Sequence, residues 1–502
     1  MLKPLPLLLL PLLLTPSLAS AEPQEIANTA LGQRWLGDQY LDNLGWRAVS
    51  PGDLNGDGLS DFLVSSPQDA GPATFDSVLR IYFGDAAGPP QSGDSDWAGT
   101  AIADPKASGD SVFQFDVVPD LTGDGIRDIL VAEPLAGQTG KVLLYAGTDG
   151  AWPGALAPQQ AAAQWNGYVE ADPWETSLAA ETQPSHVAAG DMNGDGVADV
   201  VIGSARHRKV WIDLSDGSFT GENRLQEAEH AFVRCAGTVD APTRNASEFG
   251  RDLVVGDFDG DGVDDLVVSA PNCVDGEGRV FVWYGGPALD PEVPDLILSG
   301  GDRLGGDVNV ADLNNDGLDD LFVQELRSGS NQNKSNLWIY LGANAGLPST
   351  PDVTIGGGAP DVRFGESIAM LRDVSNPPDG LAELVVGAPE TAEAGLGQGA
   401  VYIFEGLADW SGEHSTADAA YVAYGSHRDA WFGTTVAALD DFDGDGFPEV
   451  VIGEPNYTDG DAENDYRRGR IYLMTALPDR DADGDGVGTI AGDCDDTDSS
   501  VN

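Results

Sequence analysis

Residues 257–271, DFDGDGVDDLVVSAP, decide the fold, because an acidic turn with two glycines leads directly into a short apolar strand. The same pattern begins at six other aspartates, spaced 55 to 71 residues apart along the chain. This spacing is too long for a small solenoid repeat and suits one four-stranded propeller blade per copy. The sequence therefore predicts an all-β fold of seven repeated units. The other copies begin at Asp53, Asp120, Asp191, Asp312, Asp373 and Asp441.

The acidic turns have the chemistry of a calcium site. Alternate positions of each turn carry side-chain oxygens, a backbone carbonyl completes the set at position seven, and an acid closes it at position nine. Calcium prefers six to eight oxygen ligands of this kind. We therefore expect about six Ca²⁺ ions, one in each regular turn. The predicted ligands are Asp53, Asn55, Asp57, Leu59, Asp61; Asp120, Thr122, Asp124, Ile126, Asp128; Asp191, Asn193, Asp195, Val197, Asp199; Asp257, Asp259, Asp261, Val263, Asp265; Asp312, Asn314, Asp316, Leu318, Asp320; and Asp441, Asp443, Asp445, Phe447, Glu449.

The turns differ from the EF-hand calcium loop. An EF-hand loop opens in the same way but closes with a bidentate glutamate at position twelve. Position twelve is valine or isoleucine in the six regular copies, for example Val64 and Val268, and strand-forming residues surround it. The sixth copy is lengthened around Asn376-Pro377-Pro378. It is predicted to be a weak metal site at most, through Asp373, Asp379 and Glu383.

Two further marks accompany the turns. An apolar-glycine pair such as Phe249-Gly250 precedes most of them, and a tripeptide such as Gly387-Ala388-Pro389 follows. Together these features resemble FG-GAP repeats, the blades of the integrin α-subunit N-terminal propeller. The resemblance covers almost all of residues 22–478 and implies a seven-bladed β-propeller that acts in adhesion or protein interaction. The pattern departs from the family at Ser185-His186, which replaces the apolar-glycine pair, and at Gln324-Glu325-Leu326, which replaces the tripeptide.

A third strand with alternating apolar residues follows each tripeptide, for example RVFVWYGG from Arg279. A fourth strand is expected before the next turn. The seventh copy has no room for one, since the chain after Met474 becomes acidic. The segment Ile26 to Trp35 lies in the matching place ahead of the first turn. We therefore predict that this segment pairs with blade seven and closes the ring, which removes two exposed sheet edges.

The two ends of the chain differ from the repeats. Residues 1–21 contain Lys3, an apolar run and Ala19-Ser20-Ala21, and indicate a cleaved signal peptide. The protein is expected to be secreted, periplasmic or at the cell surface, without a membrane span. Residues 479–502 resemble a short aspartate-rich thrombospondin type 3 segment. Asp481, Asp483 and Asp485 are candidate weak ligands there, and a disordered acidic tail stays open as the alternative.

Charge and cysteine content limit the partners. The net charge of −58 argues against nucleic acid and against anionic membranes. Three cysteines suit export but are too few for a disulfide scaffold. Cys235 and Cys273 are close enough in the repeat order to pair, and two unpaired thiols stay open; the role of Cys494 is not indicated. We expect a monomer or one part of a larger surface assembly.

No catalytic motif stands out, and the protein is predicted not to be an enzyme. The sequence has no G-x-S-x-G and no H-E-x-x-H, and its five histidines lack ligand spacing. An extracellular or cell-surface protein or glycan is the expected partner, bound on the face opposite the acidic turns. The longer loops expected there are Pro67–Ser77, Glu325–Ser335 and Pro455–Gly469. The last loop carries Tyr457, Tyr466, Arg467 and Arg468, which suit a carboxylate or a sugar.

Two alternative functions stay open. A calcium-stabilised lectin would use exposed tryptophans for stacking, and the candidates outside the predicted core strands are Trp97, Trp152, Trp165 and Trp174. Trp211, Trp283 and Trp338 fall within third strands and are predicted to be core. A polysaccharide lyase is less favoured, because it needs basic residues that neutralise uronates and the chain has only 25 lysines and arginines.

Overall fold

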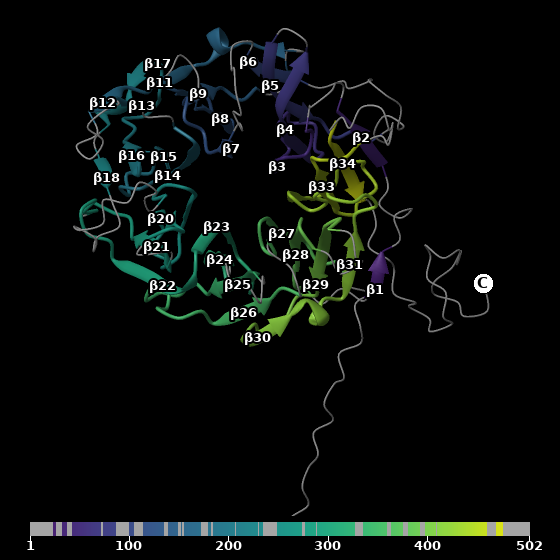
Figure 1. Cartoon of the computed structure of the whole chain (residues 1–502). Helices are drawn as coiled ribbons and strands as arrows, with labels where there is room; N and C mark the ends of the chain where they lie inside the picture. Colours follow the sequence, from purple (N-terminus) through teal and green to yellow (C-terminus); the bar gives the residue numbers. More distant parts are fainter. Residues whose placement is uncertain are drawn as a thin grey trace, which may run out of the picture.

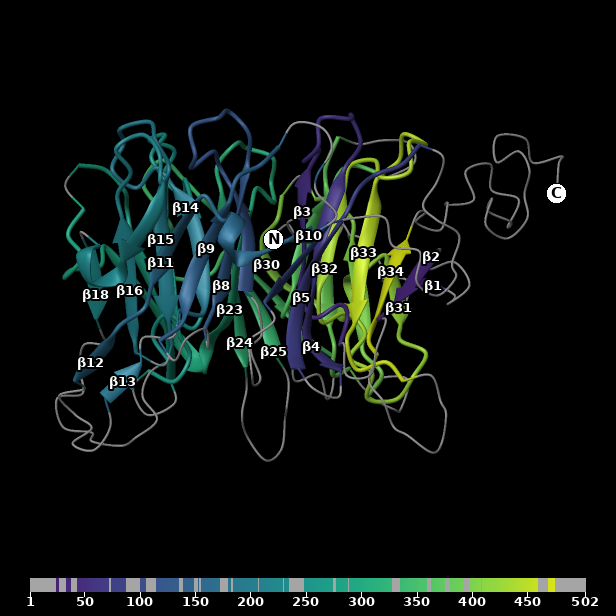
Figure 2. The same cartoon turned by 90° about the horizontal axis from the view of Figure 1, so that it is seen from above.

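A computed structural model shows seven antiparallel blades arranged in a ring, which confirms the all-β, seven-bladed propeller (Figure 1). Viewed from the side, the strands run between two opposite faces of the ring (Figure 2). The structure describes residues 24–26, 33–37, 43–71, 74–86, 100–104, 114–134, 139–148, 152, 155–171, 179–181, 184–205, 207–228, 230–233, 248–273, 277–287, 289–326, 335–358, 363–374, 380–391, 397–407, 409–458 and 468–474.

The first four blades follow the chain from its first acidic turn. Blade one contains β3 (Ala48–Gly52), β4 (Asp61–Gly71), β5 (Thr74–Tyr82) and β6 (Thr100–Asp104); blade two contains β7 (Gln114–Val118), β8 (Asp128–Glu133), β9 (Lys141–Tyr145) and β11 (Ala163–Asn166); blade three contains β14 (His186–Gly190), β15 (Asp199–Ser204), β16 (Lys209–Asp213) and β18 (His230–Val233); blade four contains β19 (Leu253–Gly256), β20 (Asp265–Ala270), β21 (Glu277–Trp283) and β22 (Leu296–Asp302).

The last three blades complete the ring. Blade five contains β23 (Leu304–Ala311), β24 (Asp320–Leu326), β25 (Ser335–Tyr340) and β26 (Val353–Gly356); blade six contains β27 (Ile368–Leu371), β28 (Glu383–Ala388), β29 (Ala400–Phe404) and β31 (Tyr421–Tyr424); blade seven contains β32 (Val436–Leu439), β33 (Glu449–Glu454), β34 (Arg470–Met474) and β2 (Gln33–Leu36). A small hairpin is formed by β12 (Val169–Ala171) and β13 (Ala179–Glu181). The described residues form no helix long and apolar enough to cross a bilayer.

The apolar-glycine pairs lie where adjacent blades meet. Gly250 and Gly433 adopt φ values of +79° and +86°, a region that favours glycine. A Cβ on Gly433 would lie 2.4 Å from the carbonyl oxygen of Ala400, which belongs to the third strand of the preceding blade. The preceding aromatic residues, Phe249 and Phe432, are buried between the blades. Glycine is therefore required for close approach, and its apolar neighbour fills the interface.

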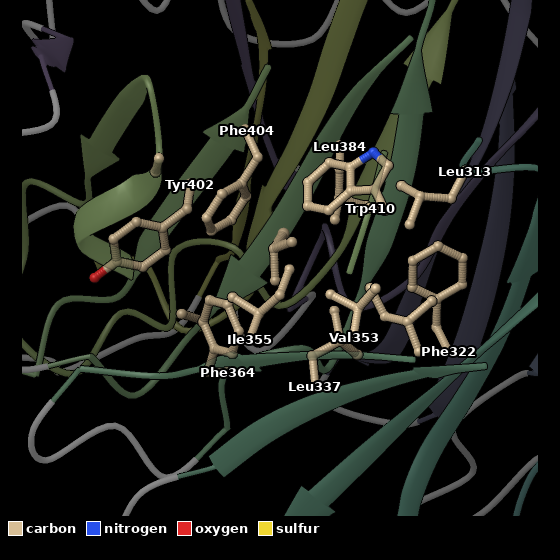
Figure 3. Packing of buried hydrophobic residues seen from close by; sticks show 14 of the residues in the cluster. Leu313, Phe322, Leu337, Val353, Ile355, Phe364, Leu384, Tyr402, Phe404 and Trp410 are labelled. Atoms are coloured by element: carbon tan, nitrogen blue, oxygen red, sulfur yellow. The ribbon is translucent and has the colours of Figure 1, made fainter. Parts of the chain in front are cut away.

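Each blade packs on the next through a separate hydrophobic cluster. Between blades five and six, Phe322 and Leu337 face Leu384 and Phe404, and Trp410 joins them from the linker that follows β29 (Figure 3). Similar clusters lie between the other pairs of neighbouring blades. Burial of apolar surface between blades therefore stabilises the whole ring rather than one central core.

The N-terminal strand closes the ring, as the sequence predicts. Residues Gln33–Leu36 pair antiparallel with Arg470–Leu473 of β34 in blade seven. The beginning of the predicted segment behaves differently, since Ile26 belongs to β1 (Gln24–Ile26), and β1 pairs in parallel with β31 of blade six. The N-terminal residues thus bind two neighbouring blades rather than one.

That second pairing belongs to a regular feature of the molecule. In four blades, the stretch of chain that leads into the fourth strand adds a fifth, parallel strand to the outer edge of the preceding blade (Figure 1). The pairs are β10 (Ala155–Leu156) on β6, β17 (Gly221–Arg224) on β11, β30 (Gly412–Ser415) on β26, and β1 on β31. Short 3₁₀ turns follow three of them: η3 (Pro158–Gln160), η4 (Leu225–Glu227) and η5 (Thr416–Asp418).

For three of the four fifth strands, linker length matches where they occur. In blades two, three and six, 16 or 17 residues separate the third strand from the fourth, and each linker forms a fifth strand. In blades four and five only 12 residues are available, and the described linker residues form none. The long linkers also share an aromatic-x-glycine signal at Trp152, Phe219 and Trp410, whose rings pack into the clusters between blades.

Candidate calcium sites

The backbone of the acidic turns is set by two left-handed residues. In the fourth blade these are Gly260 and Gly262, at positions four and six, with φ values of +72° and +83°. In the fifth blade Asn315 takes position four with a φ of +57°, and asparagine tolerates this region better than most residues. The G-D-G signature is therefore a conformational requirement of the turn.

The first aspartate holds the turn together. Oδ1 of Asp257 accepts a hydrogen bond from the N–H of Gly260 at 2.7 Å, and Oδ2 accepts one from Gly262 at 3.0 Å. Asp53 makes the same two contacts with Gly56 and Gly58 in the first blade, both at 2.7 Å. These bonds satisfy N–H groups at the tip of the turn and aim the carboxylate at its centre.

The acid at position nine is buried beneath the turn. Oδ2 of Asp265 accepts from the N–H of Phe258 at 2.9 Å, and Oδ1 accepts from Gly285 at 2.8 Å. Burial raises the pKa of Asp265 to about 7, although these two hydrogen bonds offset part of the shift. Burial likewise raises the pKa of Glu449 to about 8 in the seventh blade. A buried carboxylate with this cost of ionisation favours a nearby cation.

Three turns gather carboxylate oxygens that all lie within 4.8 Å of one another. The groups come from blades two, four and seven, and the last contains four acids. In that group, Oε1 of Glu449 is buried and has no hydrogen-bond partner among the described residues. An orphaned anionic oxygen in a set of hard oxygen donors fits a hard divalent cation. The groups are Asp120, Asp124, Asp128; Asp257, Asp259, Asp265; and Asp441, Asp443, Asp445, Glu449.

Blades one, three and five have an asparagine at position three. Asn55, Asn193 and Asn314 each accept a hydrogen bond from the N–H of the aspartate two residues later, at 2.8 to 2.9 Å. The buried position-nine acids Asp61, Asp199 and Asp320 accept from the N–H of position two, as Asp265 does. The six regular turns therefore share one arrangement of end acids.

The lengthened sixth turn keeps part of this arrangement. Asp373 accepts a hydrogen bond from the N–H of Gly380. Glu383 is buried, and its carboxylate accepts from the N–H of Val374 at 3.2 Å. Asp379 lies outside the described residues, as do Asp481, Asp483 and Asp485 of the tail. The structure thus places two of the three predicted acids of this turn.

Links between neighbouring turns were not predicted from the sequence. Asp264, at position eight of blade four, accepts a hydrogen bond from the N–H of Asp191 in blade three at 2.7 Å. Asp319 of blade five accepts in the same way from Asp257 in blade four at 2.9 Å. Position eight varies between copies, so the motif alone did not reveal this role. The turns of blades three, four and five are therefore connected by these links.

The expected ligand face is only partly described. Of its four candidate residues, Tyr466 and Arg467 lie outside the described residues. Tyr457 packs edge-on to His427 and beneath the guanidinium of Arg470, and Arg468 donates to the carbonyl of Gly37 at 2.8 Å. Both side chains thus have intramolecular contacts. The structure also corrects the loop predicted at Pro67–Ser77, because most of it extends the β4–β5 hairpin to Gly71 and Thr74.

The burial of the tryptophans differs in part from the prediction. Trp165, expected to be exposed, is completely buried in β11, and Trp152 packs against the cluster between blades one and two. Both are therefore poor stacking residues, and Trp97 and Trp174 lie outside the described residues. Trp211 and Trp283 are core residues, as predicted, and Trp338 is partly buried.

One cysteine prediction can be compared with the structure. Cys273 is buried and disulfide-bonded. This excludes a free thiol at this position, and the pairing with Cys235 stays a prediction. Cys235 and Cys494 both lie outside the described residues.

The fold and the repeated turns define a seven-bladed propeller with an acidic turn in each blade. The FG-GAP repeat pattern matches residues 45–76, 249–283 and 432–474, and the FG-GAP-like repeat pattern matches residues 120–202. The chain is therefore an integrin-α-like propeller that carries FG-GAP repeats.

The chain is also similar to parts of two longer proteins and to one solved structure. The chain is 30% identical to integrin alpha-5 of Xenopus laevis over 42% of this chain and 20% of that protein. It is 31% identical to a phosphatidylinositol-glycan-specific phospholipase D of Dictyostelium discoideum, over 42% of this chain and 25% of that protein. The matches thus span a quarter or less of these relatives. A crystal structure of BBS1N in complex with ARL6DN covers 87% of this chain and 96% of its own at 10% identity, with a TM-score of 0.44.

Proposed function

We propose that this protein is an exported, calcium-stabilised propeller that binds an extracellular or cell-surface partner without catalysis. The observation that carries the proposal is the row of similar acidic turns on one face of a propeller whose repeats match integrin α-subunits. The turns would hold about six Ca²⁺ ions through the residues predicted above, and the sixth turn would bind weakly.

The chemistry of the turns supports a structural role for the ion. The end acids are engaged by backbone N–H groups, and neighbouring turns are joined through Asp264 and Asp319. A cation in each turn would neutralise carboxylates that otherwise repel one another, and would stiffen the first hairpin of each blade. At millimolar affinity such sites fill outside a cell, which agrees with the proposed export.

The proposal is tested by measuring calcium and partner binding together. Protein expressed from the full sequence is purified from the culture medium or periplasm, and its first residue is determined. Isothermal titration counts the calcium ions, and an array of extracellular proteins and glycans is probed with calcium and with EGTA. We expect about six ions, an N-terminus at Glu22, and calcium-dependent binding to protein.

Different results would change the proposal in different ways. Absence of calcium binding would overturn the stabilising role of the turns. Binding to glycans alone would favour the lectin hypothesis. Absence of binding both with calcium and with EGTA would contradict the proposed role in binding a partner. Cleavage of a substrate from the array would contradict the non-catalytic reading.

A further inference from the structure

The outer edges of blades three and four both lack a fifth strand among the described residues, and blade four has the longer last strand. Its last strand, β22, spans seven residues, of which Leu296–Ser299 pair regularly with β21 before a bulge at Gly300 and Gly301; the outermost antiparallel strands of the other blades have four or five residues. No described residue pairs with the free side of β22, which lies on the outer rim of the ring (Figure 1). An uncovered strand edge presents backbone N–H and C=O groups that another extended chain can bind.

The molecule itself shows how such an edge is covered. In blades one, two, five and six, a fifth strand binds the outer edge, and in all four cases it runs parallel to the strand it covers. The longest of these pairings involve only four residues, as in Gly412–Ser415 on Val353–Gly356. A short parallel segment is therefore the geometry that this fold accepts at a blade edge.

Blade four lacks this cover because the linker that would supply it is short. Residues 341–352 lead from β25 to β26 and are all described, yet none of them pairs with β22. Pro348 and Pro351 interrupt the linker and cannot donate backbone hydrogen bonds. Leu347 is buried in the cluster between blades four and five, and its N–H donates to the hydroxyl of Tyr284 at 2.8 Å.

The side chains at this edge do not protect it. Residues 296–301, LILSGG, contain no charge and no proline, although natural edge strands commonly use lysine or proline to prevent pairing, and the single charge in β22 is at its last residue, Asp302. Ile297 is 40% exposed, and Val293, just before the strand, is 59% exposed. Only four large hydrophobic side chains are exposed among the described residues, and these are two of them.

Acidic residues lie beside the edge. Asp290, Glu292 and Asp295 are all exposed in the segment that leads into β22. They favour a partner with positive charge next to its extended segment. A second copy of this chain is a poor occupant, because two molecules of net charge −58 repel each other.

We propose that the edge of β22 binds an extended, basic segment of another protein, which adds a fifth strand parallel to residues 296–300. Main-chain hydrogen bonds would supply affinity, Ile297 would contact an apolar side chain, and the three acids would select lysine or arginine. This proposal deepens the interaction role proposed above and rests on it, since it names one surface and one class of partner for that role.

The test uses the full chain in calcium and about 0.15 M salt, which screens weak non-specific attraction between exposed charges. The probe is a fluorescein-labelled peptide in which lysine alternates with valine and threonine, and its binding is followed by anisotropy. A peptide of the same charge with proline at alternate positions serves as the probe control. Hydrogen exchange then locates the bound peptide on the protein.

We expect the strand-forming peptide to bind, the proline peptide to bind at least about tenfold more weakly, and the amides of residues 296–300 to become protected. Ile297→Lys should weaken binding by about tenfold or more, because an inserted lysine blocks strand addition. Leu407→Lys is the matched control, since Leu407 is 38% exposed on another blade and the substitution adds the same charge.

Two results would overturn the proposal. One is equal binding by Ile297→Lys and Leu407→Lys, which would mean that the peptide is attracted by charge alone. The other is no protection of residues 296–300 at saturating peptide. If Ile297→Lys does not fold, Ser299→Lys replaces it, because Ser299 is exposed on the same strand. The array of extracellular proteins separates this inference from the proposed function. If the parent binds a partner there and Ile297→Lys binds it equally well, only this inference fails. If the parent binds no partner, the proposed function fails.

Discussion

The acidic turns of blades four and six share a hydrogen bond between their two ends but differ in the residues between those ends. In both, a buried acid at the end of the turn accepts a hydrogen bond from the N–H of the second residue: Asp265 from Phe258, and Glu383 from Val374. The regular turn adds two acids, Asp259 and Asp261, between these ends. The sixth turn has only one acid there, Asp379, and is lengthened around Asn376-Pro377-Pro378.

The comparison separates two roles that the motif combines. The end acids accept backbone hydrogen bonds and would be needed for the turn even without an ion. In blade four, Asp259 is half-buried and Asp261 is exposed, and each accepts a hydrogen bond from the N–H two residues later, so the main use of these middle acids is to complete an oxygen cage. Blade six is then a natural example of the turn with its ion-binding part altered.

Removing calcium from the whole protein should have the largest effect. At about 2 mM calcium and dissociation constants of ~10⁻⁴ to 10⁻³ M, each occupied site adds about 0.7 to 1.8 kcal/mol to the free energy of unfolding. Loss of calcium from six such sites in EGTA should therefore lower the melting temperature by many degrees. Circular dichroism melts with calcium, with magnesium and with EGTA measure this. Identical melts would contradict a stabilising role, and a count of seven ions would remove the difference between blades four and six.

Removing the end acid should destabilise both blades. Asp265→Ala and Glu383→Ala each leave buried N–H groups unpaired, at a cost of about 1 to 3 kcal/mol per group. Urea denaturation in EGTA should therefore show a lower free energy of unfolding for both variants than for the parent. Calcium titration should distinguish them, because only Asp265→Ala is expected to lose a strongly bound ion. Equal loss of calcium by the two variants would mean that the sixth turn is a full site.

Changing a middle acid should have a smaller and purely calcium-dependent effect. Asp259→Ser keeps a hydrogen-bond acceptor for the N–H of Asp261 but removes a charged ligand. In EGTA its stability should match the parent within about 0.5 kcal/mol, since the position is a surface one. In calcium it should bind one ion fewer. The reverse experiment replaces residues 373–383 by the sequence DFDGDGFPE, and the grafted turn should gain an ion.

Much of this arrangement could be predicted from the sequence, because the determinants are local. Gly260 and Gly262 adopt backbone angles that favour glycine, and Phe249-Gly250 lies at a contact too close for a side chain on the glycine. These requirements fix residue identity at fixed spacing, so they recur visibly in each copy. The strand order and the N-terminal closure follow from that repetition.

The features that were missed depend on contacts between blades. The fifth strands result from linker length and from rings such as Trp410, which look like loop residues in sequence. Trp165 was expected to be exposed because the fourth strands were predicted without bounds, so that β11 was not placed at this residue. The links made by Asp264 and Asp319 join residues 73 and 62 positions away, at a position that varies between copies. No local pattern specifies such pairs.

Blades four and six differ again at their inner strands, near the start of each blade. Oδ2 of Asp252 in blade four accepts from the N–H of Val308 in blade five at 2.9 Å. In blade six, Oγ of Ser367 accepts from the N–H of Val436 in blade seven at 3.0 Å. The same contact between blades is thus made by a titratable group in one place and by a hydroxyl in the other.

This difference predicts a pH dependence of stability that the Asp252 contact contributes and the Ser367 contact does not. Burial, and then the charge of Asp307, raise the pKa of Asp252 to about 7 in the folded protein, while Arg47 opposes the shift. The unfolded chain ionises Asp252 near its ordinary pKa, so the folded state becomes relatively less stable as the pH rises from about 4 to about 7. Asp252→Ser keeps an acceptor for Val308 and removes the titration. In urea denaturation at fixed calcium, the stability of Asp252→Ser relative to the parent should therefore increase over this pH range. The stability of the control, Ser367→Thr, relative to the parent should stay constant. A constant difference for Asp252→Ser would show that Asp252 stays ionised in the folded ring.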